Sequence, residues 1–113
     1  MQRVLLVTSD SQVSEQVKGY ISLAEPLYEV QEAATIQGAM ELFDNQKKDL
    51  ACAIVDDFVG TDPTLNSITL IEHLRHHVAV MGLAVSDDAR NRIAWEMRNA
   101  GCALICKKSS RLS

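Results

Sequence analysis

The stretch LACAIVDDFVG, residues 50–60, is a run of small and branched apolar side chains that stops at two adjacent carboxylates, Asp56 and Asp57. A short apolar run without polar alternation predicts a strand that is buried on both faces, as in a parallel sheet. In open α/β sheets, ligands bind beyond the carboxyl ends of such strands. The two acids are therefore the first candidate functional residues.

The rest of the chain alternates apolar runs with amphipathic segments, which predicts an α/β fold around a doubly wound parallel sheet. We expect strands at residues 3–7, 28–33, 50–56, 78–85 and 103–106, with helices between them. Asp87 and Asp88 favour a helix N-terminus after the fourth strand, and Gly101 favours the end of that helix.

Length and composition narrow the class of protein. The 113 residues fit one domain, and a net charge of −4 gives no basic footprint for direct nucleic-acid binding. The apolar runs are too short to cross a membrane, and the N-terminus opens on a strand rather than a signal peptide. An odd number of cysteines within apolar segments suits a reducing compartment. We therefore expect a cytoplasmic protein.

Polar residues gather where the five expected strands end. A carboxylate can act as a nucleophile toward phosphorus, a second can help to hold magnesium, and a hydroxyl and an ammonium can bind phosphoryl oxygens. The set therefore suits aspartyl-phosphate chemistry, and its members are Thr8, Ser9, Asp10, Asp56, Asp57, Ser86, Lys107 and Lys108.

This set resembles the active site of response regulator receiver domains, and the resemblance covers nearly the whole chain. In that family an acceptor aspartate ends the third strand, a Ser or Thr ends the fourth, and a Lys ends the fifth. Asp56 precedes Ser86 by 30 positions and Ser86 precedes Lys108 by 22, which are the family's intervals. The resemblance implies a three-layer flavodoxin-like (CheY-like) fold with a five-stranded parallel sheet of order 2-1-3-4-5.

The sequence departs from the family at several positions. Thr8 and Ser9 replace the acidic pair that holds magnesium, so the implied Mg²⁺ site is weakened, with Asp10, Asp56 and Asp57 as its remaining candidate ligands. Lys107 fits the lysine position if one residue is missing after Gly101. Asp57 is expected to point away from Asp56, because successive strand residues face opposite sides. The family's last helix is expected to be short or missing.

The resemblance implies a phosphoacceptor rather than an enzyme: Asp56 takes a phosphoryl group from a sensor histidine kinase or phosphotransfer protein, and the domain changes a contact with an output domain, a partner protein or a second copy. The alternative is a pseudo-receiver that binds partners without phosphorylation. We treat residues 1–113 as one receiver-like domain, either complete or cut from a longer protein.

Two further features concern surfaces. Trp95 lies off the apolar stripe of the fourth helix and is expected to be exposed, which makes it a candidate partner contact. The histidines of HLRHH, residues 73–77, are interpreted as cations near a helix C-terminus rather than as metal ligands. A nucleotide-binding enzyme is disfavoured, because no glycine-rich loop follows the first strand.

Overall fold

The computed structural model describes residues 2–23, 28–57, 64–85, 88 and 90–108. Its sheet is parallel, with the strand order β2-β1-β3-β4-β5, as predicted. The strands are β1 (Arg3–Val7), β2 (Glu29–Ala33), β3 (Leu50–Asp56), β4 (Ala79–Ala84) and β5 (Leu104–Lys107). The helices are α1 (Ser11–Ile21), α2 (Ile36–Gln46), α3 (Ser67–Leu74) and α4 (Arg92–Ala100), with a 3-10 turn η1 (Lys47–Asp49) before β3.

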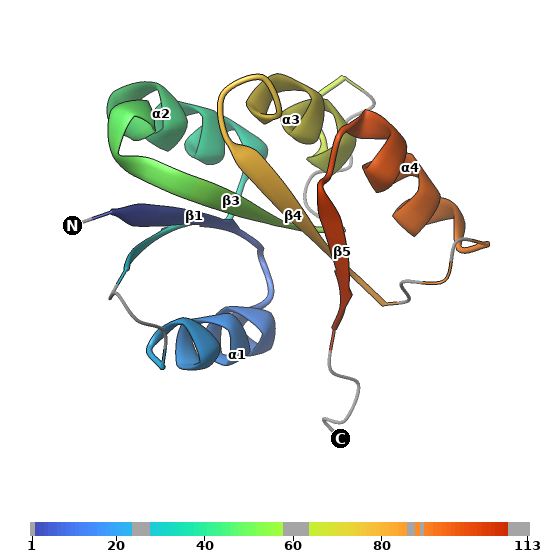
Figure 1. Ribbon diagram of the computed structural model, residues 1–113, viewed down its shortest axis with the longest axis horizontal. Coiled ribbons are helices and arrows are strands. Elements are labelled where there is room, and N and C mark those ends of the chain that lie inside the picture. The colour runs from blue at the N-terminus through green and yellow to red at the C-terminus, as the bar shows by residue number, and fades with distance from the viewer. Residues whose placement is uncertain (1, 24–27, 58–63, 86–87, 89, 109–113) are drawn as a thin grey trace.

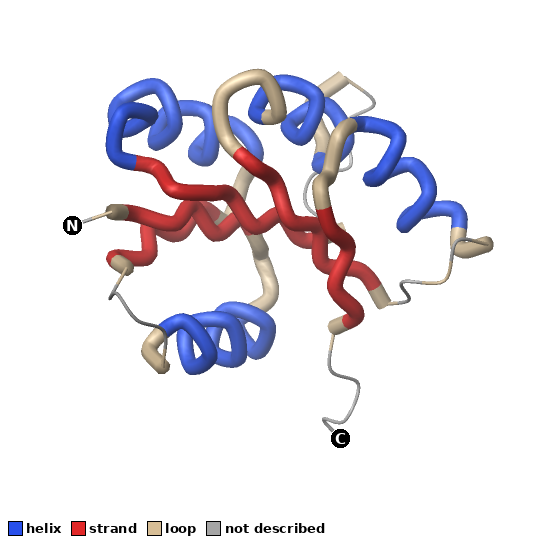
Figure 2. Tube along the Cα trace, in the orientation of Figure 1, coloured by secondary structure: helices blue, strands red, loops and turns tan. Residues whose placement is uncertain are grey.

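The helices cover the two faces of the sheet unequally. Figures 1 and 2 show α2, α3 and α4 on one face and α1 on the other. In β3, Ala53 and Val55 pack into the core beneath α2–α4, whereas Ile54 packs into the core beside α1. Successive side chains of a strand point to opposite faces, so a strand covered on both sides must be apolar throughout. This confirms the interpretation of residues 50–56 as a buried strand.

The start of α4 differs from the prediction. The helix begins at Arg92 rather than near Asp88, because Asn91 is its N-cap and accepts a 3.0 Å hydrogen bond from the Ala94 amide. Asp88 instead accepts hydrogen bonds from the backbone and side chain of Arg90 within a turn. A side-chain amide oxygen caps a helix as well as a carboxylate does, so propensity alone could not choose between them.

The end of α4 matches the prediction. Gly101 has a φ of 126°, which a residue with a side chain rarely adopts, and its amide donates to the carbonyl of Arg98. A Cβ at this position would lie 2.2 Å from the side chain of Arg75, which packs against the glycine. Gly101 thus ends the helix and lets α3 and α4 approach.

The face beside α1 holds an apolar groove of about 470 Å³, whose lining includes Val13, Val17, Ile54, Met81, Leu83 and Cys106.

The expectation of a short or missing last helix falls on residues 109–113, which lie outside the described part of the chain. None of the described helices combines the length and apolar character needed to cross a membrane.

Candidate functional site

Thr8 and Asp56 meet because β1 and β3 are neighbours. The register pairs Val7 with Val55, which places the next residue of each strand at the same edge of the sheet. There Thr8 Oγ1 donates a hydrogen bond of 2.7 Å to Oδ2 of Asp56, and both residues are buried. A residue predicted only as a neutral replacement for an acid is therefore a direct partner of the candidate acceptor.

Lys108 lies immediately after β5 and binds both carboxylates. Its backbone amide donates to the carbonyl of Ala84 at 2.8 Å, which extends the β4–β5 pairing by one residue. Its Nζ donates to Oδ1 of Asp56 at 2.8 Å and to Oδ1 of Asp57 at 2.7 Å. Lys107, the alternative, is exposed. The structure therefore brings Lys108 to Asp56, at the spacing that needs no missing residue.

Hydrogen-bond donors surround the Asp56 carboxylate. Oδ2 accepts from Thr8, and Oδ1 accepts from Lys108 and from the backbone amide of Asp57 at 2.9 Å. Burial acts to raise the pKa of Asp56, but the hydrogen bonds from Lys108 and Thr8 outweigh it and hold this pKa below its ordinary value. Asp56 is therefore kept ionised by the protein's own groups.

Asp57 was expected to leave the site, and the structure corrects this. Its side chain does lie on the other side of β3, where Oδ2 accepts from the Val85 amide at 3.2 Å, yet Oδ1 still reaches Lys108. The long lysine stem spans both carboxylates, which strand alternation alone does not reveal. Burial raises the pKa of Asp57, and the neighbouring Asp56 raises it further against the effect of Lys108.

Asp10 has a different partner from the other candidates. Asp10 is the N-cap of α1, and its Oδ1 accepts from the amides of Gln12 and Val13 at 2.8 and 3.4 Å. Ser86 lies outside the described residues. A residue that the sequence analysis missed is Ser67, whose Oγ donates to the backbone carbonyl of Asp56 at 2.7 Å. Its position at the start of α3, which begins at the same edge of the sheet, was the available signal.

Comparison with known proteins gives a clear result for structure only. The sequence matches no protein-family model and no curated protein. Among solved structures, a response regulator receiver domain protein from Clostridium thermocellum is 17% identical, with a TM-score of 0.72, over 96% of this chain and 82% of that one. At such identities a likeness concerns the fold. The chain has the receiver-domain fold.

Two other structures with the receiver fold show the same likeness. A complex of CheY6 with the P1 domain of CheA3 from R. sphaeroides matches with a TM-score of 0.77 at 16% identity, over 98% of this chain and 85% of that one. TrrA from Thermotoga maritima, solved with Mg²⁺ and beryllium fluoride, matches with a TM-score of 0.71 at 17% identity, over 98% and 90%.

The described residues do not fit the magnesium ion that the resemblance implies. The ammonium of Lys108 binds both Asp56 and Asp57. Thr8 donates a hydrogen bond to Asp56 and has no negative charge with which to bind a metal ion. Asp10 caps a helix, and no group of three His, Cys, Asp or Glu among the described residues could hold a metal. Mg²⁺ is usually held by one or two carboxylates and several waters in near-octahedral order, and here the ammonium of Lys108 lies where that cation would meet both carboxylates.

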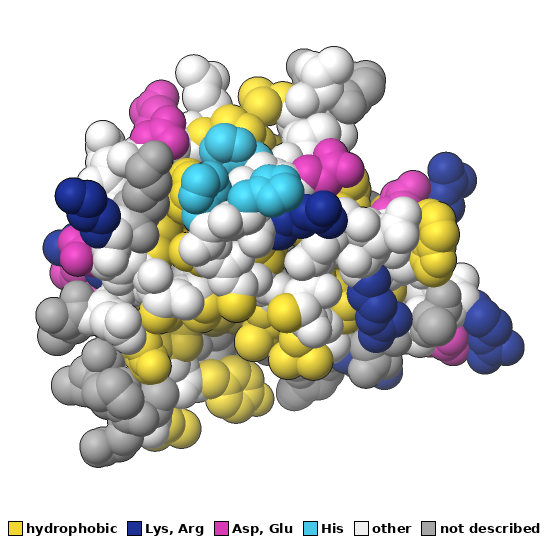
Figure 3. All heavy atoms as spheres, turned by 45° about the horizontal axis from the view of Figure 1, so that its top comes forward, with side chains coloured by type: hydrophobic (Ala, Val, Ile, Leu, Met, Phe, Trp, Pro, Cys, Tyr) yellow, Lys and Arg dark blue, Asp and Glu magenta, His cyan; other side chains and the backbone are white. Residues whose placement is uncertain are grey.

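The receiver resemblance implies an aromatic switch position at Ile105 or Leu104, and both residues are aliphatic. Ile105 is buried in the core beneath α2–α4, whereas Leu104 is exposed. On α4, Trp95 is 56% exposed, as predicted. Figure 3 shows the three histidines together on one face of the protein. The ring centroids of His73 and His77 lie 5.6 and 5.2 Å from that of Phe43.

Proposed function

We propose that this chain is a receiver-fold interaction module that binds a partner protein without being phosphorylated. The observation that carries the proposal is the 2.7 Å hydrogen bond from Thr8 to Asp56. The hydroxyl of Thr8 binds Oδ2 of Asp56, and Thr8 stands at a position where the receiver family has an acid. The module would offer a preformed surface, and its Asp56 site would hold β1, β3 and β5 together.

The physical reason is electrostatic. A carboxylate that attacks a phosphoryl group brings two anions together, and a divalent cation normally offsets this repulsion. Here Lys108 is the cation that contacts Asp56, and it is shared with Asp57. One positive charge thus already serves two carboxylates, which leaves no surplus for an incoming phosphoryl dianion.

The second candidate is a phosphoacceptor receiver domain, and one distance favours it. Lys108 Nζ lies 2.8 Å from Oδ1 of Asp56, close enough to bind the oxygens of a phosphoryl group on Asp56, the role that the receiver resemblance implies for it. In this function Asp56 would accept the phosphoryl group from a histidine kinase or phosphotransfer protein, and Ser86 and Lys108 would bind its oxygens. The domain would be a substrate of that partner rather than an enzyme.

One experiment decides between the two functions. The protein is incubated with Mg²⁺ and acetyl phosphate beside a receiver domain with an intact acidic pair as positive control, and intact mass is measured before and after hydroxylamine. We expect no adduct, and no change in Trp95 fluorescence on Mg²⁺ titration. A hydroxylamine-labile phosphoryl adduct would overturn the proposal, and its loss in Asp56→Asn or in Asp57→Asn would identify the acceptor.

A further inference from the structure

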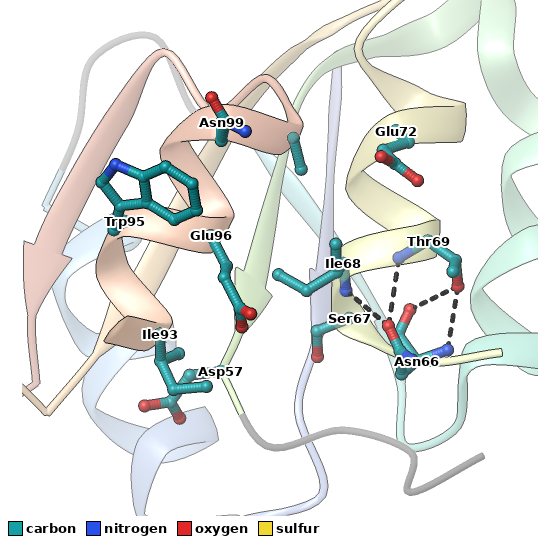
Figure 4. Close-up of a pocket in the computed structure, with 11 residues that line it drawn as sticks. Asp57, Asn66, Ser67, Ile68, Thr69, Glu72, Ile93, Trp95, Glu96 and Asn99 are labelled. Atoms are coloured by element: carbon teal, nitrogen blue, oxygen red, sulfur yellow. Dashed lines mark hydrogen bonds between the residues drawn. The ribbon is translucent and has the colours of Figure 1, made fainter. Parts of the chain in front are cut away.

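A groove of about 490 Å³ lies between α3 and α4. Figure 4 shows the α4 side chains Trp95 and Glu96 on one side of it and Ile68 and Glu72 of α3 on the other. The volume falls within the range of roughly 300 to 1,000 Å³ that is usual for binding pockets. The groove is thus large enough to hold one long side chain with its neighbours.

The charges along the groove have one sign. Asp57, Glu72 and Glu96 line it, and the described lining residues include no Lys, Arg or His. Arg92 approaches Glu96 at 3.5 Å, but its side chain is 88% exposed, and such surface pairs contribute little. Asp57 already shares Lys108 with Asp56, so Glu72 and Glu96 are the carboxylates that a bound cation would meet.

Trp95 adds a second kind of contact at the edge of this groove. It is the one tryptophan of the chain, and more than half of its side chain is exposed. Exposed tryptophans often serve as anchors in protein interfaces, and the face of an indole ring attracts cations. Ile68 and Ile93 provide partly buried apolar surface between the acidic groups.

We infer that the groove between α3 and α4 docks a segment of a partner protein that inserts an arginine flanked by apolar side chains. The guanidinium would lie against Trp95 and pair with Glu96 or Glu72. Arginine fits better than lysine, because its planar group can stack on an indole while its fork binds a carboxylate. This inference rests on the proposed interaction function and names its surface and the chemistry of its partner.

The test uses the full chain and two peptides, acetyl-Leu-Arg-Leu-amide and its counterpart with neutral citrulline in place of arginine. Binding is followed by Trp95 fluorescence and by backbone amide shifts in NMR spectra. We expect the arginine peptide to bind about tenfold more tightly than the citrulline peptide, since only arginine carries the charge. Its shifts should map to residues 66–72 and 93–100.

Variants distinguish binding in the groove from a general attraction between the acidic protein surface and a cationic peptide. Glu96→Gln and Glu72→Gln should each weaken binding of the arginine peptide about threefold, as expected for one partly exposed ion pair. Trp95→Ala, followed by NMR, should weaken it similarly. Glu41→Gln removes an exposed carboxylate on α2 that does not line the groove, and it should leave binding unchanged. All four positions are partly or fully exposed, so folding should survive.

Several results would overturn the inference. They are equal binding of the two peptides, shifts that map to the α1 face, an equal loss in Glu41→Gln, or a groove already covered by self-association at working concentrations. The proposed function fails on a different readout, the phosphoryl adduct. A chain that forms no adduct but binds both peptides equally keeps the proposed function and loses the groove assignment.

Discussion

Thr8, which directly follows β1, and Asp56, the last residue of β3, are joined by a 2.7 Å hydrogen bond at the buried edge of the sheet. The hydroxyl also accepts a 3.1 Å hydrogen bond from the amide of Asp10, so it connects the acceptor position to the start of the loop before α1. A receiver fold normally has a carboxylate near this point. Here a neutral donor stabilises Asp56 where an acid would repel it.

Removing this hydroxyl should destabilise the fold. Thr8→Val keeps the shape of the side chain but leaves one buried carboxylate oxygen short of a donor, which costs about 1 to 3 kcal/mol in the free energy of unfolding. Urea unfolding followed by circular dichroism measures the loss. Thr8→Ser, which keeps the hydroxyl, should lose clearly less; equal losses in both variants would show that the methyl contact matters instead.

Restoring an acid should restore a response to magnesium. Thr8→Asp places a third carboxylate beside Asp56 and Asp57, and like charges about 4 Å apart repel by up to about 4 kcal/mol at an effective dielectric of 20. We expect a lowered Tm that millimolar Mg²⁺ raises again. Ser11→Asp adds an exposed carboxylate in the first turn of α1, and its Tm should not change with Mg²⁺. If the Tm of Thr8→Asp does not change with Mg²⁺ either, the prediction is wrong.

Loss of the shared lysine should be among the most damaging single changes. In Lys108→Met, two carboxylates whose side chains are 4% and 0% exposed would lose their cation. Breaking a buried ion pair from one side typically costs about 3 to 5 kcal/mol. The neighbouring variant Lys107→Met alters an exposed side chain and should stay within about 0.5 kcal/mol of the parent. Similar unfolding midpoints for the two variants would refute the bridging role.

Asp57 should make stability fall as the pH rises. The folded state holds the pKa of Asp57 above its unfolded value, so its contribution is fully present below pH of about 3.9 and is lost as the pH rises through the folded pKa. We expect Asp57→Asn to remove this loss. Relative to the parent, the variant should therefore gain stability as the pH rises from acid towards neutrality.

Asp56 should act in the opposite direction, which gives an internal comparison. The folded state lowers the pKa of Asp56, so its contribution is present above the unfolded pKa and is lost as the pH falls through the folded one. Asp56→Asn should flatten the acid side of the profile. Urea titrations from pH 3 to pH 8 measure both variants, with Asp44→Asn on the exposed part of α2 as control. Profiles that shift in the same direction would be inconsistent with the two assignments.

Much of the fold was predictable, because the spacing of apolar residues along the chain reflects which faces of each helix or strand are buried. The run before Asp56 is apolar throughout since β3 is covered on both faces, and Gly101 marks a helix end that needs a positive φ. The start of α4 was misplaced because Asp88 and Asn91 are both good caps, and in the structure Asn91 accepts the capping hydrogen bond from Ala94.

The candidate site was also predictable in part. The sequence by itself determined that Asp56 and Lys108 reach the edge of the sheet, since the ends of the third and fifth strands follow from the hydrophobic pattern. Only the tertiary structure decided their partners. Neighbouring β1 and β3 make Thr8 a donor to Asp56, and a flexible lysine stem joins carboxylates that strand alternation had placed apart. Periodicity gives the direction in which a side chain leaves the backbone, whereas its contacts depend on which strands are neighbours and on how far the side chain extends.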